Sequence, residues 1–236
     1  MVNTAPDYPF ERIVEVVSSI PNKQDRVYAE LLFCLACREG EIVPYVHYKH
    51  KYSKQTDEEP NKLLDKKQIA CSYGINVDDV YFTGDFIGFN KIPVFKTKNL
   101  SESKAGFIFK KNNPFFYDIL TWVQKRKAIR ENKKGEGNIT PVYLFDVPVQ
   151  GVEDIQRDFW ARRKRLERQL KKADKLFRPH SLRKSRATIA GNISGDVFYV
   201  RDLLGHKSIE MSSRYVAKKK LFDSIQKYEV DNEEEF

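Results

Sequence analysis

The sequence has few of the features that mark secreted and membrane proteins. Its three cysteines, Cys34, Cys37 and Cys71, are too few for a disulfide framework and favour a reducing compartment. The longest purely apolar run, Leu31 to Cys37, is far shorter than the roughly 18 residues that a membrane span needs. No basic segment followed by an apolar one opens the chain, so no signal peptide is expected. These absences predict a cytoplasmic globular protein with no membrane partner.

Positive charge is concentrated in one part of the chain. The sequence has 42 Lys and Arg against 33 Asp and Glu, a net charge of +9. Thirteen of the cations and three of the anions lie between Gln156 and Arg186, a local +10, so the remainder carries 9 − 10 = −1. Such a stretch suggests a polyanionic partner, because cations that neutralise phosphates release condensed counterions. The alternative is a solvated helix face.

Hydrophobic spacing predicts a mainly α-helical chain with a small antiparallel β-sheet, an α+β fold. Strand signals occupy Val77–Phe109, and the polar segment Tyr45–Asn76 is interpreted as an insertion with room for one short helix. Lys133–Asn138 is expected to be a loop, and Gly191 and Gly195 to interrupt the chain. The predicted helices span Phe10–Ile20, Gln24–Val43, Asn113–Lys127, the basic stretch through Phe177, Pro179–Ala190, Asp196–Leu204 and a last segment from Ser208.

The basic stretch carries an apolar stripe at helical spacing. The stripe consists of Phe159, Arg163, Leu166, Leu170, Ala173 and Phe177, so it is expected to face a core. The cations outside the stripe are then left on exposed or DNA-facing sides of the helix. The candidate DNA-binding residues are Arg162, Lys164, Arg165, Arg168, Lys171 and Lys172, together with Lys184 on the next helix.

Two motifs lie close together after the basic stretch. Residues 178–216 contain H-x-x-R, formed by His180 and Arg183, then L-G-H with His206, and then Tyr215 nine residues later. H-x-x-R alone is usually structural, since residues three apart share a helix face. A lone tyrosine here would more often be a packed aromatic.

A third motif precedes these two in the chain. Arg38, Glu41 and Ile42 form R-x-x-E-I within LACREGEI, near the end of an apolar helix. The three motifs, in this order and spacing, resemble the tyrosine recombinase (phage integrase) family over about residues 25–220. The resemblance implies the fold of that family's catalytic domain.

The resemblance also implies an active site. The implied catalytic residues are Arg38, Lys98, His180, Arg183, His206 and the nucleophile Tyr215. The lysine belongs on a turn between strands, where Lys98 is preferred, Lys96 comes second and Lys104 third. Glu41 resembles the acidic residue that supports the first arginine.

Elementary chemistry makes this set coherent. A phenol has a pKa of about 10, so Tyr215 needs an electrophile held in line and activated. Two guanidiniums match the non-bridging oxygens of a phosphodiester and stabilise charge in its transition state. His180 can take the phenolic proton, His206 can donate to the phosphate, and a lysine can protonate the leaving oxygen. No metal or other cofactor is expected. Cys34 and Cys37 form C-x-x-C within an apolar run without a second pair, so they are interpreted as core residues.

The predicted function is site-specific DNA recombination through a 3′-phosphotyrosyl intermediate, for integration or excision of a mobile element. The partner is double-stranded DNA, in a nucleoid-associated setting or in the host cytoplasm if a virus or plasmid carries the gene. A type IB topoisomerase shares this chemistry, although the L-G-H-x-x-I setting favours a recombinase. A non-catalytic DNA-binding relic is the other alternative.

The expected organisation is an N-terminal segment over 1–23, the catalytic domain over 24–220 with its insertion at about 45–76, and a C-terminal helix with an acidic tail over 221–236. Only 37 residues precede Arg38, so the family's separate core-binding domain is not expected in this chain, which is either a fragment or a minimal recombinase. Leu221, Phe222 and Ile225 are spaced to pack on a neighbouring protomer, which predicts self-association on DNA.

Overall fold

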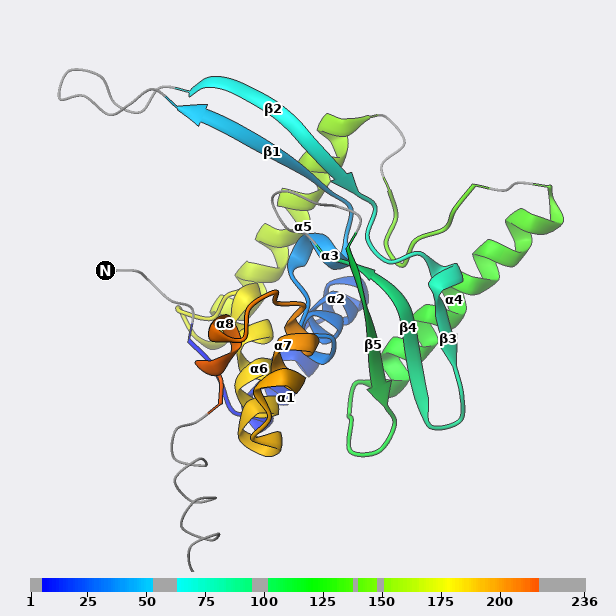
Figure 1. Ribbon diagram of the computed structural model, residues 1–236. Helices are drawn as coiled ribbons and strands as arrows, with labels where there is room; N and C mark the ends of the chain where they lie inside the picture. The colour runs from blue at the N-terminus through cyan, green and yellow to red at the C-terminus, as the bar shows by residue number, and fades with distance from the viewer. Residues whose placement is uncertain (1–5, 53–62, 95–101, 138–139, 148–150, 217–236) are drawn as a thin grey trace, which may run out of the picture.

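Helices dominate the computed structural model of the chain (Figure 1). It describes residues 6–52, 63–94, 102–137, 140–147 and 151–216. The helices are α1 (Phe10–Ser18), α2 (Lys23–Cys34), α3 (Glu39–Ile42), α4 (Phe116–Gly135), α5 (Val152–Ala173), α6 (Pro179–Ser194), α7 (Val197–Leu204) and α8 (Glu210–Ser213), with the 3-10 turn η1 (Val77–Asp79). The strands are β1 (Tyr45–Tyr52), β2 (Leu63–Ser72), β3 (Val80–Phe82), β4 (Phe86–Pro93) and β5 (Ser103–Phe109). The predicted class, mainly helical with a small antiparallel sheet, is confirmed.

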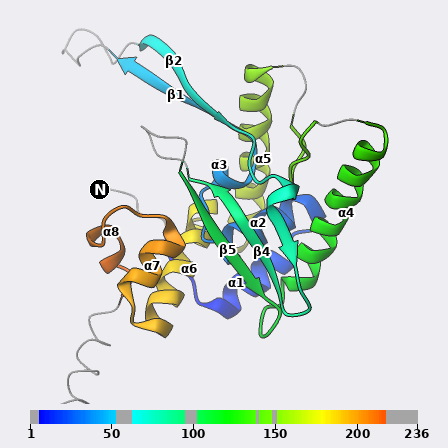
Figure 2. The ribbon, with the colours of Figure 1, turned by 45° about the vertical axis from the view of Figure 1, so that its right-hand side comes forward.

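Helix α2 lies at the centre of the hydrophobic core, in contact with α1, α4, α5 and α6 (Figures 1 and 2). Leu31, Leu32 and Phe33 follow one another in the sequence and are all buried, which requires neighbours around the whole helix. The predicted first helix is confirmed as α1, whose Ile13 and Val17 join the same core. Among the described residues, no helix is both long and apolar enough to cross a membrane.

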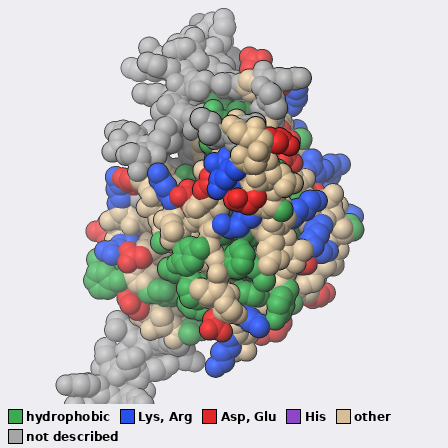
Figure 3. Space-filling model, turned by 90° about the vertical axis from the view of Figure 1, so that its right-hand side faces the viewer, with side chains coloured by type: hydrophobic (Ala, Val, Ile, Leu, Met, Phe, Trp, Pro, Cys, Tyr) green, Lys and Arg blue, Asp and Glu red, His purple; other side chains and the backbone are tan. Residues whose placement is uncertain are grey.

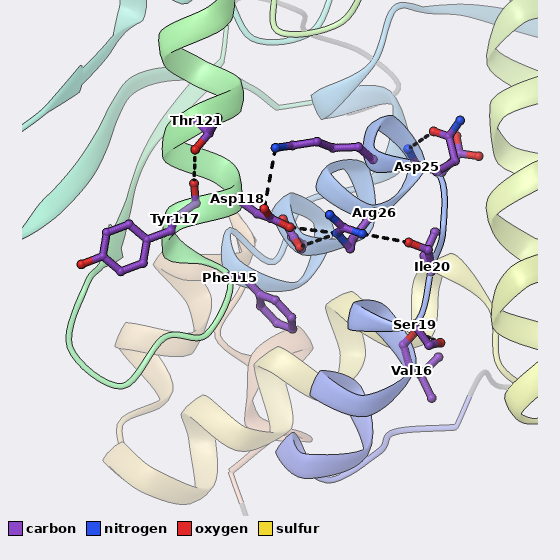
Figure 4. Close-up of polar contacts among 12 residues, drawn as sticks. Val16, Ser19, Ile20, Asp25, Arg26, Phe115, Tyr117, Asp118 and Thr121 are labelled. Carbon is purple, nitrogen blue, oxygen red and sulfur yellow. Dashed lines mark hydrogen bonds and ion pairs between the residues drawn. The ribbon is translucent and has the colours of Figure 1, made fainter.

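Polar contacts fix the beginning of α2 to α4 (Figure 4). The Asn22 side chain accepts a hydrogen bond from the Asp25 backbone N–H at 3.0 Å and so caps α2. The Arg26 guanidinium donates to the Asp118 carboxylate at 2.8 Å and to the Ile20 carbonyl at 3.2 Å. One side chain therefore joins α2, the turn before it and the first turn of α4.

The three-stranded sheet has the order β3-β4-β5 and is antiparallel throughout. Ile87 and Phe89 of β4 and Ile108 of β5 are buried on its inner face. The outer face keeps aromatic side chains exposed, among them Phe107 and Phe109. Hydrophobic side chains gather in the middle of the face shown in Figure 3, the side of the molecule that carries this sheet and α4.

Residues 45–52 and 63–72 of the polar segment Tyr45–Asn76 form a β-hairpin, so the expectation of a short helix is wrong for these described residues. β1 and β2 pair antiparallel from Tyr45 opposite Ser72 outward, and they project from the body of the protein (Figures 1 and 2). Cross-strand pairing satisfies the inward-facing peptide groups of such a hairpin and water satisfies the outward-facing ones, so the hairpin needs no apolar period in its sequence. Its base is anchored where the Tyr45 ring packs 4.4 Å from that of Phe159 on α5.

The predicted bounds of α4 and α6 also differ from those in the structure. Helix α4 begins at Phe116, because Asn113 Oδ1 accepts from the Phe115 N–H at 3.0 Å and holds the preceding residues in a turn. It then continues to Gly135, into the segment expected to be a loop. Gly191 does not interrupt α6, which ends instead at Gly195, in the left-handed conformation with φ 64°.

Candidate active site

The motif residues converge where the end of α2, the start of α6 and the end of α7 meet. Helix α2 packs on α6, α6 on α7, and α7 on α8. A small apolar cluster of Ala36, Ala187, Ala190, Val200 and Leu204 fills the space between them. Small side chains let the helices approach closely, so residues far apart in sequence share one site.

Arg38 lies just after a break in the predicted helix Gln24–Val43, which is wrong as a single element. Helix α2 stops at Cys34, and Ala36 adopts a left-handed conformation with φ 47°. Arg38 is the N-cap residue before α3, and its backbone N–H donates to Glu41 Oε2 at 2.8 Å. Arg38 Nη1 donates to Glu41 Oε1 at 2.9 Å. Buried Glu41 therefore holds both the backbone and the side chain of Arg38.

Arg183 is buried, with 3% of its surface exposed, and connects the ends of two helices. Its Nη1 donates to the Ala36 carbonyl at 2.5 Å, and its Nη2 donates to the Leu204 carbonyl at 2.8 Å. Nη1 also lies 3.6 Å from Glu41 Oε2. Burial lowers the pKa of Arg183, and Glu41 opposes that shift. A guanidinium stays protonated in proteins, so this one is a fixed positive charge.

His180 stands in the first turn of α6, directly after Pro179 at the first helical position. Its side chain reaches the surface beside the two arginines. Partial desolvation, followed by the positive charges of Arg183 and Arg38, lowers its pKa below the usual 6.5. The ring is therefore neutral at pH 7 and able to accept a proton.

His206 follows Gly205, which ends α7 in the left-handed conformation with φ 61°. The His206 Nδ1 atom lies 2.9 Å from the hydroxyl oxygen of Ser212, and Ser212 is fully buried. This contact fixes the orientation of the imidazole ring. No sequence motif indicated Ser212, because its contact with the His206 ring forms only in the folded protein.

Tyr215 follows α8 and packs partly buried against the small apolar cluster. Its backbone N–H donates to the Ser212 carbonyl at 3.0 Å, so Ser212 contacts both motif residues of this segment. A Cβ atom on Gly191 would lie 2.2 Å from the Tyr215 carbonyl oxygen. The close approach of the Tyr215 backbone to α6 thus requires glycine at position 191, a requirement that sequence reasoning missed.

The lysine position is described only in part. Lys98, the preferred candidate, and Lys96, the second, both lie outside the described residues. Lys104 is described: its Nζ donates to the Leu35 carbonyl at 2.9 Å and to the Leu203 carbonyl at 2.5 Å. Burial lowers the pKa of Lys104, while Cys37 and Glu41 raise it and Arg183 and Arg38 lower it further.

The basic helix α5 ends at Ala173, so the prediction that it runs through Phe177 is wrong. It faces the core with Phe159, Leu166 and Leu170 of the predicted stripe, but its cations differ from the expectation. Arg162 is buried, with Nε 2.6 Å from Asp158 Oδ2, so the prediction that it is exposed is wrong. Its guanidinium lies over the Phe145 ring, which supplies a partner that the sequence could not reveal. Arg165 contacts buried Asp25 through two bonds of 3.1 and 3.2 Å.

The other predicted DNA-binding cations reach solvent to different extents. Lys164, Arg168, Lys171 and Lys172 are exposed, although Lys171 also lies 2.7 Å from Glu167. Lys184 is half-buried and 3.7 Å from Asp7. These residues therefore differ in how much of their charge an approaching anion would meet.

The remaining chemistry of the described residues is limited. Burial raises the pKa of the Cys34 thiol to about 12 and that of the Cys37 thiol to about 11, so neither is a reactive thiolate at neutral pH. Within the described ranges, no group of three or more His, Cys, Asp or Glu side chains could hold a metal ion. Two arginines, two histidines and a tyrosine remain, a set suited to a phosphodiester.

Comparison with solved structures shows the same fold in DNA recombinases. The XerH site-specific recombinase bound to difH substrate, in a pre-cleavage complex, has a TM-score of 0.58 at 15% identity, covering 97% of this chain and 56% of its own. The Tn1549 transposon integrase, in complex with transposon right-end DNA, has a TM-score of 0.52 at 13% identity, covering 96% and 66%. The XerA recombinase has a TM-score of 0.50 at 17% identity, covering 95% and 64%. This chain thus spans between about half and two thirds of these proteins.

No curated protein matches the sequence. The sequence profile of the Phage integrase family matches residues 96–221, more than half of the chain. That range contains His180, Arg183, His206 and Tyr215, the residues of the two later motifs. The chain therefore belongs to the phage integrase family.

Proposed function

We propose that this protein is a site-specific DNA recombinase that cleaves and rejoins strands through a 3′-phosphotyrosyl intermediate, in the integration or excision of a mobile element. The observation that carries the proposal is the convergence of Arg38, His180, Arg183, His206 and Tyr215 on one junction of helices. Membership of the phage integrase family supports it. Two of the similar structures hold DNA substrates, which supports double-stranded DNA as the partner.

The proposed cleavage step is a transesterification. The Tyr215 hydroxyl oxygen attacks the scissile phosphorus, a Tyr215 O–P bond forms, and the bond from phosphorus to the 5′-oxygen breaks. Neutral His180 accepts the phenolic proton, and Lys98 donates a proton to the departing 5′-oxygen. The reverse attack by a 5′-hydroxyl restores the phosphodiester and the tyrosine, so no external energy source is required.

The arginines stabilise the charge that grows on the phosphate oxygens during this step. Arg38 is held by Glu41 and keeps a third of its side-chain surface exposed, at 33%, so it can contact a bound phosphate. Arg183 adds a buried, desolvated positive charge, and the low dielectric around it strengthens its attraction for the phosphate. Neither charge changes protonation during the reaction.

The test is covalent capture on DNA. A pool of nicked duplexes with a randomised cleavage region is incubated with the protein, and complexes that survive SDS are collected. The wild-type protein should yield such complexes, and Tyr215→Phe should yield none while keeping nearly the same DNA affinity, since one hydroxyl contributes little to a phosphate-dominated interface.

The matched control is Tyr199→Phe, because Tyr199 is an exposed tyrosine on neighbouring α7 and should be dispensable. Covalent DNA on the Tyr215→Phe variant would contradict the proposal. Sequence selectivity of the captured pool distinguishes a recombinase from a type IB topoisomerase, which would also relax supercoiled DNA of scrambled sequence.

Self-association on paired DNA sites is part of the proposal. Leu221, Phe222 and Ile225, the residues expected to mediate it, lie outside the described residues. Sedimentation with and without a paired-site duplex should show a monomer alone and a larger assembly on DNA. Deletion after Lys219 should impair assembly more than binding to a single site.

A further inference from the structure

Lys104 occupies a position between two segments of the site. It lies near the start of β5, opposite Ile92 of β4. Its ammonium donates to the Leu35 carbonyl at the end of α2 and to the Leu203 carbonyl at the end of α7, at 2.9 and 2.5 Å. The last carbonyls of a helix have no partner within the helix, so a side chain that supplies hydrogen bonds to two helix ends joins them.

Arg183 makes the same kind of bridge one residue further along each of the two segments. It donates to the Ala36 and Leu204 carbonyls, which follow Leu35 and Leu203 directly. Two consecutive carbonyls at each helix end are therefore joined by two cationic side chains. We call this arrangement of Lys104, Arg183 and the four carbonyls the carbonyl bridge.

The carbonyl bridge lies next to two residues of the reaction. Arg38 is two residues after Ala36, and His206 is two residues after Leu204. Between Leu204 and His206, Gly205 turns the chain over the stem of Lys104: a Cβ on that glycine would lie 3.6 Å from Lys104 Cδ. Lys104 thus contacts the backbone close to both residues.

We propose that Lys104 is a positioning residue that holds the Arg38 segment against the His206 segment, and that it does not protonate the leaving oxygen. The inference rests on the proposed function, since it concerns the geometry of that site. Two of the three ammonium N–H groups donate to backbone carbonyls in a part-buried position. The arrangement fits a fixed donor better than a group that transfers its proton to DNA.

The test compares Lys104→Met, Lys104→Arg and the control Lys91→Met in single-turnover cleavage of a substrate captured by the wild-type protein. Methionine keeps an apolar stem and removes all donors, whereas arginine keeps donors and charge. Lys91 is an exposed lysine on β4 of the same sheet. Lys104→Met should cleave at least tenfold more slowly with DNA affinity within about twofold of wild type, and Lys104→Arg should recover much of the rate.

A substrate with sulfur in place of the bridging 5′-oxygen separates positioning from proton donation. A thiolate leaves without a proton, so a lost acid is rescued by sulfur and a lost positioning contact is not. Rescue of Lys104→Met by this substrate would overturn the proposal, as would an unchanged cleavage rate. An inactive wild-type protein would overturn the proposed function itself, and the Lys104 role with it.

A spectroscopic measurement tests the proposal without activity. The protein has four histidines, so the ring resonances of His206 can be assigned with a His206→Gln variant. Lys104→Met should shift the His206 ring resonances, and Lys91→Met should leave them in place. Unshifted His206 resonances in a folded Lys104→Met variant, with folding checked by thermal melting, would overturn the proposal.

Discussion

Two regions of the molecule are rich in cations, and they differ in how many carboxylates neutralise those cations. At the junction of α2, α6 and α7, Arg38 and Arg183 share the single carboxylate of Glu41. Arg183 and Lys104 also donate there to backbone carbonyls. On α5, Arg162, Arg163 and Arg165 each contact a carboxylate, at distances between 2.6 and 3.1 Å. A backbone carbonyl accepts a hydrogen bond from a cation and leaves its charge in place. A carboxylate accepts the hydrogen bond and also neutralises the charge.

This difference changes where positive charge is available. In the sequence, the entire excess lies between Gln156 and Arg186. In the structure, much of the charge on α5 is neutralised locally, while the junction concentrates Arg38, Arg183 and Lys104 around the carboxylate of Glu41. The count of cations in a segment is therefore a poor measure of the field that a phosphate meets.

The largest expected effect comes from Arg183→Lys. Lysine keeps the charge but cannot make both carbonyl contacts and the planar fork, so cleavage should fall by about 100-fold or more, as for loss of an oxyanion donor worth about 3 kcal/mol. The matched variant is Arg162→Lys on α5, which alters another buried arginine, paired with Asp158. It should change stability and leave single-turnover cleavage nearly intact. Equal cleavage defects in the two variants would break the comparison.

The same distinction applies to buried carboxylates. Glu41 contacts two arginines, whereas Glu30 on α2 lies 3.8 Å from Arg26 and its Oε2 atom has no hydrogen-bond partner in the described part of the chain. Burial, followed by the charge of Asp118, raises the pKa of Glu30 to about 8. The folded protein therefore holds a proton that the unfolded chain releases above its own pKa.

The consequence is a loss of stability as pH rises. Between about pH 4.5 and 8 the native state binds more protons than the unfolded state, so the free energy of unfolding should fall by about 1 kcal/mol per pH unit from this group. Glu30→Gln should flatten this slope and stabilise the protein at pH 8, measured by denaturant unfolding. Glu131→Gln, at an exposed carboxylate of α4, should leave the slope unchanged. A Glu30→Gln variant that is less stable than wild type at pH 8 would contradict this account.

A smaller effect concerns the reaction below neutral pH. The desolvation and positive charges that lower the pKa of His180 should keep the ring neutral down to below pH 6.5. As a general base it then works through the neutral range, and cleavage should decline about tenfold per pH unit below its pKa. The measurement is the single-turnover rate from pH 5 to 8. An acid limb with its midpoint above pH 6.5 would exclude His180 as the group responsible.

The smallest effect separates paired from unpaired cations on α5. Lys164 and Arg168 are exposed, and replacing both by Ala should reduce the slope of log K against log[salt] by about 1.8 if both contact phosphates. Replacing Arg157 and Lys171, which pair with Asp154 and Glu167, should reduce the slope less, because their charge is already neutralised. Identical slopes for the two double variants would show that pairing does not matter for DNA binding.

The sequence predicted the elements whose causes are local. The period of apolar residues located α1 and the buried face of α5, and the strand signals located the three-stranded sheet. The motifs directed attention to Arg38, Arg183 and Tyr215, which lie at the junction of α2, α6 and α7, and their catalytic roles stay predictions. Gly195 and Gly205 both adopt the left-handed conformation that ends a helix, a role expected for Gly205.

The sequence could not predict features that depend on distant partners. The carbonyls exposed by the break after Cys34 accept hydrogen bonds from Lys104 and Arg183, which lie more than 60 positions away in the sequence. Gly191 was predicted to interrupt a helix, but glycine is required there because the Tyr215 backbone approaches α6 closely. Arg162 was predicted to be exposed, but it is buried and its guanidinium lies over the ring of Phe145. The sequence of the β1–β2 hairpin has no apolar period from which its strands could be predicted.

One measurement tests the central claim most directly, which is that the residues gathered at the junction serve attack by Tyr215 on a phosphodiester. The captured covalent complex is digested with nuclease and protease, and the peptide that retains a nucleotide is sequenced by mass spectrometry. The account predicts a single modified peptide, with the nucleotide joined to Tyr215 through a phosphate. A nucleotide on any other residue, or a wild-type protein that retains no nucleotide after incubation with the nicked pool, would contradict it.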